Sequence, residues 1–216
     1  LYLYIRIYKI FSSYKITKVN LEIAYPELSK TEIELISKLS IRESLISSFE
    51  TLYTWGRSPH HSNNQLFKIE NNFLLCKTYE EKNGLITVAI HNRSVDMLLG
   101  WINSKIKTVS LYKKIKINAL EKFVKKNREY GGSKSYETSI GGVRKILQAL
   151  KSKGAICFAA DQVPQRGLGK YIKLYNRDAY TTTLVQSLAV KTGAPVLYIF
   201  INSNKNGFLY VSVKQC

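Results

Sequence analysis

The sequence predicts an α/β fold, with a mainly parallel central sheet flanked by helices and a helical lead at the N-terminus. Two short, nearly continuous apolar runs, residues 85–90 and 155–160, are typical of strands buried on both faces. Such runs alternate along the chain with helical patterns, which favours a parallel sheet. The 216 residues are 45% hydrophobic and 22% charged, so the composition is globular and the length suits one domain.

We expect a helical lead over residues 1–55. Ser29 and Glu32 have the spacing of a capping box, which predicts a helix start there. The apolar residues expected on one face of this helix are Ile33, Ile36, Leu45, Phe49 and Leu52. Residues 1–16 form either an element packed on the domain or a segment that lies at a membrane surface, and both readings stay open. Residues 56–72, which contain Pro59 and two histidines, indicate a loop.

The α/β core is expected over residues 85–213, within a single domain that spans residues 1–216. Glycines at positions 131, 132, 154 and 193 mark the ends of helices. The expected elements are a strand at 85–90, a helix at 94–103, a strand at 108–111, helices at 115–129 and 143–150, a strand at 155–160, a loop at 167–170, a helix at 184–190, a strand at 196–201 and a hairpin partner at 208–213.

Charge and motifs exclude several classes of protein. Lys and Arg number 33 against 15 Asp and Glu, so the net charge of +18 favours anionic partners. Three cysteines without CxxC spacing exclude a disulfide scaffold and a cysteine zinc site, and they suit a reducing compartment. No run of about 18 apolar residues is present, so we expect no spanning helix. Motifs of serine hydrolases, P-loop proteins, dinucleotide-binding proteins and common nucleic-acid-binding modules are missing, and we expect neither a nucleic-acid partner nor a metal.

Two polar residues follow buried strands directly. His91 comes after the strand at 85–90, and Asp161 comes after the strand at 155–160. Ligands of open α/β sheets bind beyond the carboxyl ends of the strands. Parallel strands would therefore bring His91 and Asp161 to one cleft, although the role of Asp161 stays open between the site and a structural ion pair.

His91 and Asp96 form an H-x4-D pattern. If the chain turns from strand to helix here, Asp96 can fold back onto the imidazole and hold one tautomer, so that the other ring nitrogen accepts a proton from a hydroxyl. The alternative is a histidine hydrogen-bonded to backbone beside a solvated aspartate.

Ten basic residues lie between positions 105 and 134, with Glu121 and Glu129 as the only acids. This stretch is either a solvated helix face or a phosphate-binding wall. Arg128 is the most informative member, because a guanidinium binds a phosphate or a developing oxyanion with two hydrogen bonds.

Several motifs, in one order over residues 19–202, resemble those of the bacterial late lipid A acyltransferases, the lauroyl/myristoyl transferases of the lysophospholipid acyltransferase superfamily. The matching segments are Asn20-Leu21 with Ala24 to Ser29 (N-L-x-x-A-F-P-E-x-S), His91 to Asp96 (H-x4-[D/E]), Tyr112-Lys113-Lys114 (Y-R-P), Arg128, Gly142-Val143-Arg144 with Asp161-Gln162-Val163-Pro164 (G-V-R and P-D-Q-x-P), and Thr181 to Leu184 with Thr192 to Val196 (T-x-x-x and [ST]-G-A-P-V). The sequence departs from H-x-G-N-W-E at Arg93, Val95 and Asp96, and it has Leu174-Tyr175-Asn176 where F-F-G is common.

The resemblance implies acyl transfer from an acyl-carrier-protein thioester to a hydroxyl of a lipid A precursor, at the cytoplasmic face of the inner membrane. His91 would be the base, Asp96 would orient it, Arg128 would stabilise the oxyanion, and Asp161 would lie in the cleft. Lys113, Lys114, Arg144 and Thr181 would bind substrate. The implied partners are acyl carrier protein, an anionic glycolipid acceptor and the membrane surface, with no cofactor besides the thioester.

The same observations leave alternatives open. Glycerophospholipid acyltransferases and acyltransferases of mannosylated inositol lipids have similar motifs, and a basic protein that binds membrane or nucleic acid without catalysis would share the charge. An N-terminal anchor and a C-terminal portion that the resembled family carries are not part of this sequence, so two readings stay open: a fragment truncated at both ends, or a diverged member with weak or altered activity.

Overall fold

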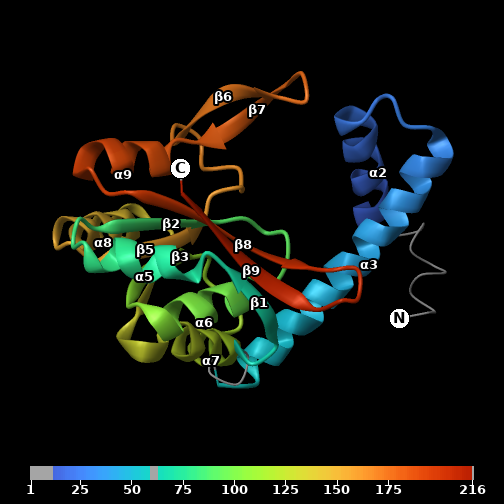
Figure 1. Cartoon of the computed structure of the whole chain (residues 1–216). Helices are drawn as coiled ribbons and strands as arrows, with labels where there is room; N and C mark the ends of the chain where they lie inside the picture. The colour runs from blue at the N-terminus through green and yellow to red at the C-terminus, as the bar shows by residue number, and fades with distance from the viewer. Residues whose placement is uncertain (1–11, 59–62, 216) are drawn as a thin grey trace. The chain divides into compact units, whose positions relative to one another are not determined.

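The computed structural model describes residues 12–58 and 63–215 (Figure 1). The chain divides into two compact units. One contains the chain up to Phe49 together with Ile172–Ala179, and the other contains Glu50–Tyr171 and the chain from Tyr180 onward. Residues 1–11 of the predicted N-terminal segment lie outside the described residues, and the single domain stays a prediction.

From β2 to β5 the described strands alternate with helices, as the sequence predicts, and the β6–β7 and β8–β9 pairs then follow without a helix inside either pair. The helices are α2 (Ser12–Ala24), α3 (Lys30–Trp55), α5 (Asn72–Glu80), α6 (Val95–Lys105), α7 (Asn118–Arg128), α8 (Ile140–Lys151) and α9 (Leu184–Thr192). The strands are β1 (Leu66–Glu70), β2 (Leu85–Ala89), β3 (Thr108–Tyr112), β4 (Lys134–Glu137), β5 (Ala155–Ala159), β6 (Gly169–Leu174), β7 (Arg177–Thr182), β8 (Val196–Ser203) and β9 (Leu209–Gln215).

The central sheet has seven strands in the order β1-β9-β8-β2-β5-β3-β4. Neighbouring strands pair in parallel, except that β8 and β9 form an antiparallel pair. The predicted α/β fold with a mainly parallel sheet, flanking helices and an N-terminal helical lead is confirmed. The predicted hairpin between residues 196–201 and 208–213 is confirmed as well.

Helices cover both faces of this sheet because its central strands are apolar on both. On β2, Leu85 and Ala89 pack in one core with α5 and α6, whereas Ile86 and Val88 pack in a second core with α8 and α9. All five residues of β2 are buried. Successive side chains of a strand point to opposite faces, so a continuous apolar run is needed to fill both cores.

Caps place the helices that follow the strands. Ser94 is the N-cap of α6 and its hydroxyl accepts a hydrogen bond from the backbone of Met97, and Ser139 does the same for α8 from Gly142. The predicted capping box at α3 is confirmed: Ser29 donates to the Glu32 carboxylate through its backbone N–H at 2.8 Å. No helix within residues 12–58 and 63–215 is long and apolar enough to cross a membrane.

Three expectations are corrected. The predicted loop at 56–72 contains β1, which pairs in parallel with β9. Because β9 lies far along the chain, the local sequence around β1 does not reveal this pairing. The predicted loop at 167–170 overlaps the start of β6. Phe49 and Leu52 are 65% and 58% exposed rather than packed with Ile33, because Phe49 lies about four and a half turns along the helix, on the opposite side.

Candidate active site

His91 and Asp161 meet at the carboxyl edge of the sheet. Strands β2 and β5 pair in parallel with Ala89 opposite Ala159, and each polar residue lies two positions beyond that pair. The Nδ1 atom of His91 is 2.7 Å from Oδ1 of Asp161, and the backbone N–H of His91 donates to Oδ2 at 2.7 Å. One carboxylate therefore holds both the ring and the backbone of His91, and the prediction that the two residues come together is confirmed.

The electrostatics of this pair favour an ionised aspartate. Burial alone would raise the pKa of Asp161, but hydrogen bonds from the backbone and ring of His91 outweigh it, so the pKa lies below its ordinary value. A carboxylate at Nδ1 fixes the proton on that nitrogen and leaves Nε2 as the acceptor. Nε2 lies 3.4 Å from the side-chain nitrogen of Gln162, and the His91 side chain is 44% exposed. The ring is oriented and open to a substrate.

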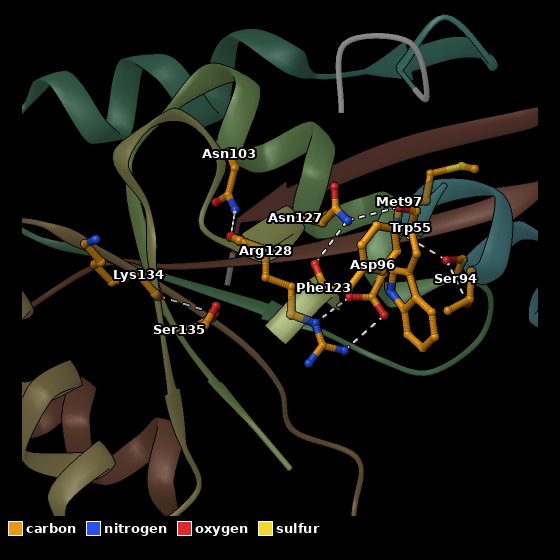
Figure 2. Close-up of polar contacts among 12 residues, drawn as sticks. Trp55, Ser94, Asp96, Met97, Asn103, Phe123, Asn127, Arg128, Lys134 and Ser135 are labelled. Carbon is orange, nitrogen blue, oxygen red and sulfur yellow. Dashed lines mark hydrogen bonds and ion pairs between the residues drawn. The ribbon is translucent and has the colours of Figure 1, made fainter. Parts of the chain in front are cut away.

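Asp96 has a different partner from the one expected. Its two oxygens accept hydrogen bonds from Nε of Arg128 at 2.6 Å and from Nη2 at 3.0 Å (Figure 2). The predicted contact of Asp96 with the imidazole is therefore corrected, since Asp161 occupies that place. The reason lies in the helix: the first turn of α6 carries Asp96 toward α7, where Arg128 ends the helix.

The Asp96–Arg128 pair ties two helices together. The side chains are 11% and 18% exposed, and the Arg128 guanidinium also lies 5.4 Å from the centre of the Tyr112 ring. The backbone carbonyl of Arg128 accepts from Asn103 of α6 at 2.9 Å (Figure 2). Two N–H donors of Arg128 and its positive charge are thus engaged by Asp96. This arrangement favours a structural role for Arg128 over the predicted role in stabilising an oxyanion.

The segment between His91 and α6 is braced from the end of α3. The buried side chain of Arg93 forms an ion pair with Glu50 through Nη2 and Oε1. The hydroxyl of Thr51 donates to that of Ser94, the N-cap of α6, at 3.0 Å. In the sequence, Arg93 stands out only as a departure from the glycine of the motif. A basic residue in place of that glycine was the one available sign that an acidic partner is needed.

The predicted substrate-binding residues lie on three elements. Lys113 and Lys114 directly follow β3, which pairs in parallel with β5, so they leave the sheet at the same edge as His91. Both are exposed, and Lys114 lies 3.2 Å from Glu137. Arg144 is exposed on α8, and Thr181 is partly exposed on β7. Their substrate contacts stay predictions.

Glu121 holds the segment that follows β3. This role was missed in the sequence, where Glu121 is one of only two acids in a basic stretch. Its carboxylate accepts from the Tyr112 hydroxyl and from the backbone of Ile115 at 2.9 Å. The hydrogen bond from Tyr112 lowers the pKa of Glu121, while burial raises the pKa of Tyr112. This buried acid fixes the direction in which Lys113 and Lys114 leave the strand.

Within the part of the chain that the structure describes, no group of three or more His, Cys, Asp or Glu side chains is arranged to hold a metal ion. No curated protein matches the chain. A family model described as bacterial lipid A biosynthesis acyltransferase matches residues 4–214, nearly the whole sequence. This match agrees with the order of motifs and with an α/β fold that carries a histidine at the carboxyl edge of its sheet. The chain belongs to the family of bacterial lipid A biosynthesis acyltransferases.

Proposed function

We propose that this acyltransferase moves a fatty acyl group from an acyl-carrier-protein thioester to a hydroxyl of a lipid A precursor, with His91 as the general base. The observation that carries the proposal is the 2.7 Å contact between Nδ1 of His91 and Asp161. A hydroxyl is too weakly acidic to ionise unaided, and an exposed imidazole with a fixed tautomer and an unprotonated Nε2 can take its proton when the hydroxyl replaces the 3.4 Å contact of Nε2 with Gln162. Asp161, rather than Asp96, is then the residue that orients the base.

The transfer proceeds as an exchange of one acyl bond for another. Nε2 of His91 removes the hydroxyl proton while the oxygen attacks the thioester carbonyl carbon. The tetrahedral intermediate collapses, the carbon–sulfur bond breaks, and the imidazolium returns the proton to the leaving thiolate. Asp161 stabilises the imidazolium that exists between the two proton transfers, as the carboxylate of a catalytic triad does.

The basic residues fit substrates that carry negative charge. Lys113 and Lys114 at the carboxyl edge would contact phosphates of the anionic glycolipid, and Arg144 and Thr181 would contribute further contacts, as the motif resemblance implies. An acidic carrier protein and a membrane surface with anionic headgroups suit the net charge of +18. The cytoplasmic face of the inner membrane is where these partners would meet the enzyme.

A mass-shift assay tests the proposal. The purified chain is incubated with a tetra-acylated lipid A precursor and a defined acyl-carrier-protein thioester, and mass spectrometry follows the addition of one acyl group. We expect His91→Ala to abolish the shift. The matched control is His60→Ala/His61→Ala, which removes the two other histidines and retains transfer. Unchanged turnover in folded His91→Ala would falsify the assignment of the base.

Donor and acceptor are separated by substitution in the same assay. Replacing the carrier protein with an acyl coenzyme A, and the lipid A precursor with lysophosphatidic acid or a mannosylated inositol lipid, should lower turnover. Equal or higher turnover with acyl coenzyme A would contradict the carrier-protein donor. Equal or higher turnover with another lipid would assign the enzyme to the acyltransferases of that lipid. Neither result would change the assignment of His91 as the base.

A further inference from the structure

The β6–β7 hairpin forms a two-stranded sheet of its own and does not pair with the seven-stranded sheet (Figure 1). Tyr175 and Asn176 connect the strands, and both have positive φ, of 49° and 59°, as a two-residue type I′ turn requires. Every residue of β6 after Gly169 is exposed. Isolated two-stranded hairpins are marginally stable in water, so this one needs other support.

The base of the hairpin has that support. The Tyr180 hydroxyl accepts hydrogen bonds from the backbone of Gly167 and Gly169 at 2.8 and 2.9 Å, and its ring lies 5.1 Å from that of Tyr171. Lys173 and Asp178 form an ion pair across the strands at 2.8 Å. At the turn, the Tyr175 ring lies 6.0 Å from that of Tyr25, while the side chains of Ile172 and Leu174 stay exposed.

Large apolar and aromatic side chains remain exposed toward the turn. Tyr171 is 72% exposed, Ile172 49%, Leu174 53% and Tyr175 51%. Lys173 and Asp178 face each other, so by the alternation of a strand Ile172 and Leu174 lie on the other face. Exposed apolar side chains gathered on one small element mark a surface that is covered in function.

Cations accompany these apolar side chains. Lys170, Lys173 and Arg177 stand against a single acid, Asp178, which Lys173 already pairs. Tyrosines with an apolar ring and a polar hydroxyl favour the boundary between lipid and water, and lysine or arginine beside them meets anionic headgroups. A second copy of the chain would bring the same cations and be repelled. An acidic protein would satisfy the cations but not Ile172 and Leu174.

We propose that the β6–β7 hairpin docks on an anionic lipid bilayer, with Ile172 and Leu174 in the interfacial region and Arg177 at the headgroups. The docking surface is outside the residues assigned to catalysis, and it rests on the membership of the chain in a family that acts on a lipid rather than on the role of His91.

Vesicle binding by the full chain tests this surface. The probe is a vesicle of phosphatidylglycerol mixed with phosphatidylcholine, and the measurement is cosedimentation. We expect Ile172→Ser/Leu174→Ser to lower the partition coefficient about tenfold, as the loss of two half-buried aliphatic side chains implies. The matched control is Ile140→Ser/Val190→Ser, which removes side chains that are 76% and 83% exposed on α8 and α9 and should change binding less than about twofold.

A tryptophan added to the two that the chain already has reports insertion even if the double variant folds poorly. On these vesicles, the difference spectrum between Leu174→Trp and the parent chain should be blue-shifted and quenched by lipids brominated in their acyl chains, whereas the difference spectrum of Val190→Trp should show neither effect. Water-like emission from Leu174→Trp in vesicle-bound protein overturns the proposal, and so does an equal loss of binding in the two double variants.

Acyl transfer in detergent micelles separates this inference from the proposed function. The hairpin variant should transfer acyl groups in micelles and fail to bind vesicles, while His91→Ala should bind vesicles and fail to transfer. Loss of vesicle binding in both variants, or in neither, contradicts the assignment of docking to the hairpin.

Discussion

One carboxylate holds both the ring and the backbone of His91, so Asp161 is the residue whose removal should disturb the imidazole most. We expect Asp161→Asn to lower kcat of acyl transfer by about 10²- to 10⁴-fold, because the amide no longer fixes the tautomer or stabilises the imidazolium. Asp96→Asn, which loosens the pair with Arg128 instead, should cost less in kcat. The measurement is the pH profile of kcat for both variants, and a larger loss in Asp96→Asn contradicts the assignment.

The lowered pKa of Asp161 also links its contacts to folding stability. A carboxyl group whose pKa is lower in the folded than in the unfolded state adds stability above its unfolded value of about 3.9, and this contribution is lost as the pH falls through the folded value. The free energy of unfolding of the wild-type chain should therefore exceed that of Asp161→Asn by a constant amount above about pH 5, and this difference should shrink as the pH falls. Urea unfolding at several pH values measures it, and a difference that grows toward low pH has the wrong sign.

At the scale of elements, Gly142 sets how closely α8 approaches the end of β4. A Cβ atom at this position would lie 2.2 Å from the carbonyl oxygen of Glu137 and 2.9 Å from a methyl group of Leu111. The neighbouring Gly141 is in open surroundings, where a Cβ would meet the Ser139 hydroxyl at an ordinary 3.6 Å. The two glycines therefore differ although they share one turn of one helix.

We expect Gly142→Ala to destabilise the fold by about 1–3 kcal/mol, since backbone must move to admit the methyl group. Gly141→Ala should instead stabilise it by about 0.5–1 kcal/mol, because alanine favours the helix. Thermal unfolding of both variants is the measurement. Equal effects would mean that helix propensity, and not the contact with Glu137, decides the cost at position 142.

The end of α3 braces the segment after His91 through a buried pair of charges. Removing one partner of such a pair leaves the other charge buried, so Arg93→Met should cost about 3–5 kcal/mol. Lys38 and Glu34 on the same helix form an exposed pair at 3.2 Å, and Lys38→Met should cost less than about 1 kcal/mol. Urea unfolding compares them, and a cost for Arg93→Met no larger than for Lys38→Met would show that the brace is not needed.

Local patterns were sufficient to predict most of this architecture and the meeting of His91 with Asp161. The apolar runs at β2 and β5 are buried on both faces of the sheet, and a parallel pairing alone brings His91 and Asp161 together. The partner of the imidazole was predicted wrongly, because the H-x4-D spacing considers only five residues of chain. The choice between Asp96 and Asp161 depends on Arg128, 32 positions from Asp96, which tertiary structure places beside it.

The elements that were missed depend on distant or atypical partners. Strand β1 is five residues long and enters the sheet only through β9, more than a hundred positions later. The β6–β7 turn uses Tyr175 and Asn176, where the common hairpin turns have glycine, so its sequence did not indicate a hairpin. Pairing over a long separation and positive φ at non-glycine residues are not encoded in a short window of sequence.

At the scale of the whole molecule, a net charge of +18 and the apolar hairpin should contribute to membrane binding in separable ways. Raising the ionic strength from about 0.1 M to 1 M shortens the screening length from about 10 Å to 3 Å, which weakens attraction by headgroups but leaves apolar burial in place. We therefore expect the affinity for phosphatidylglycerol vesicles to fall steeply with salt. The ratio between the wild-type chain and Ile172→Ser/Leu174→Ser should stay constant over the same range. Cosedimentation of both proteins across a salt series measures the two quantities together. A ratio that falls to one at high salt would mean that the hairpin acts through charge alone, and binding that salt does not weaken would remove the role given to the net charge.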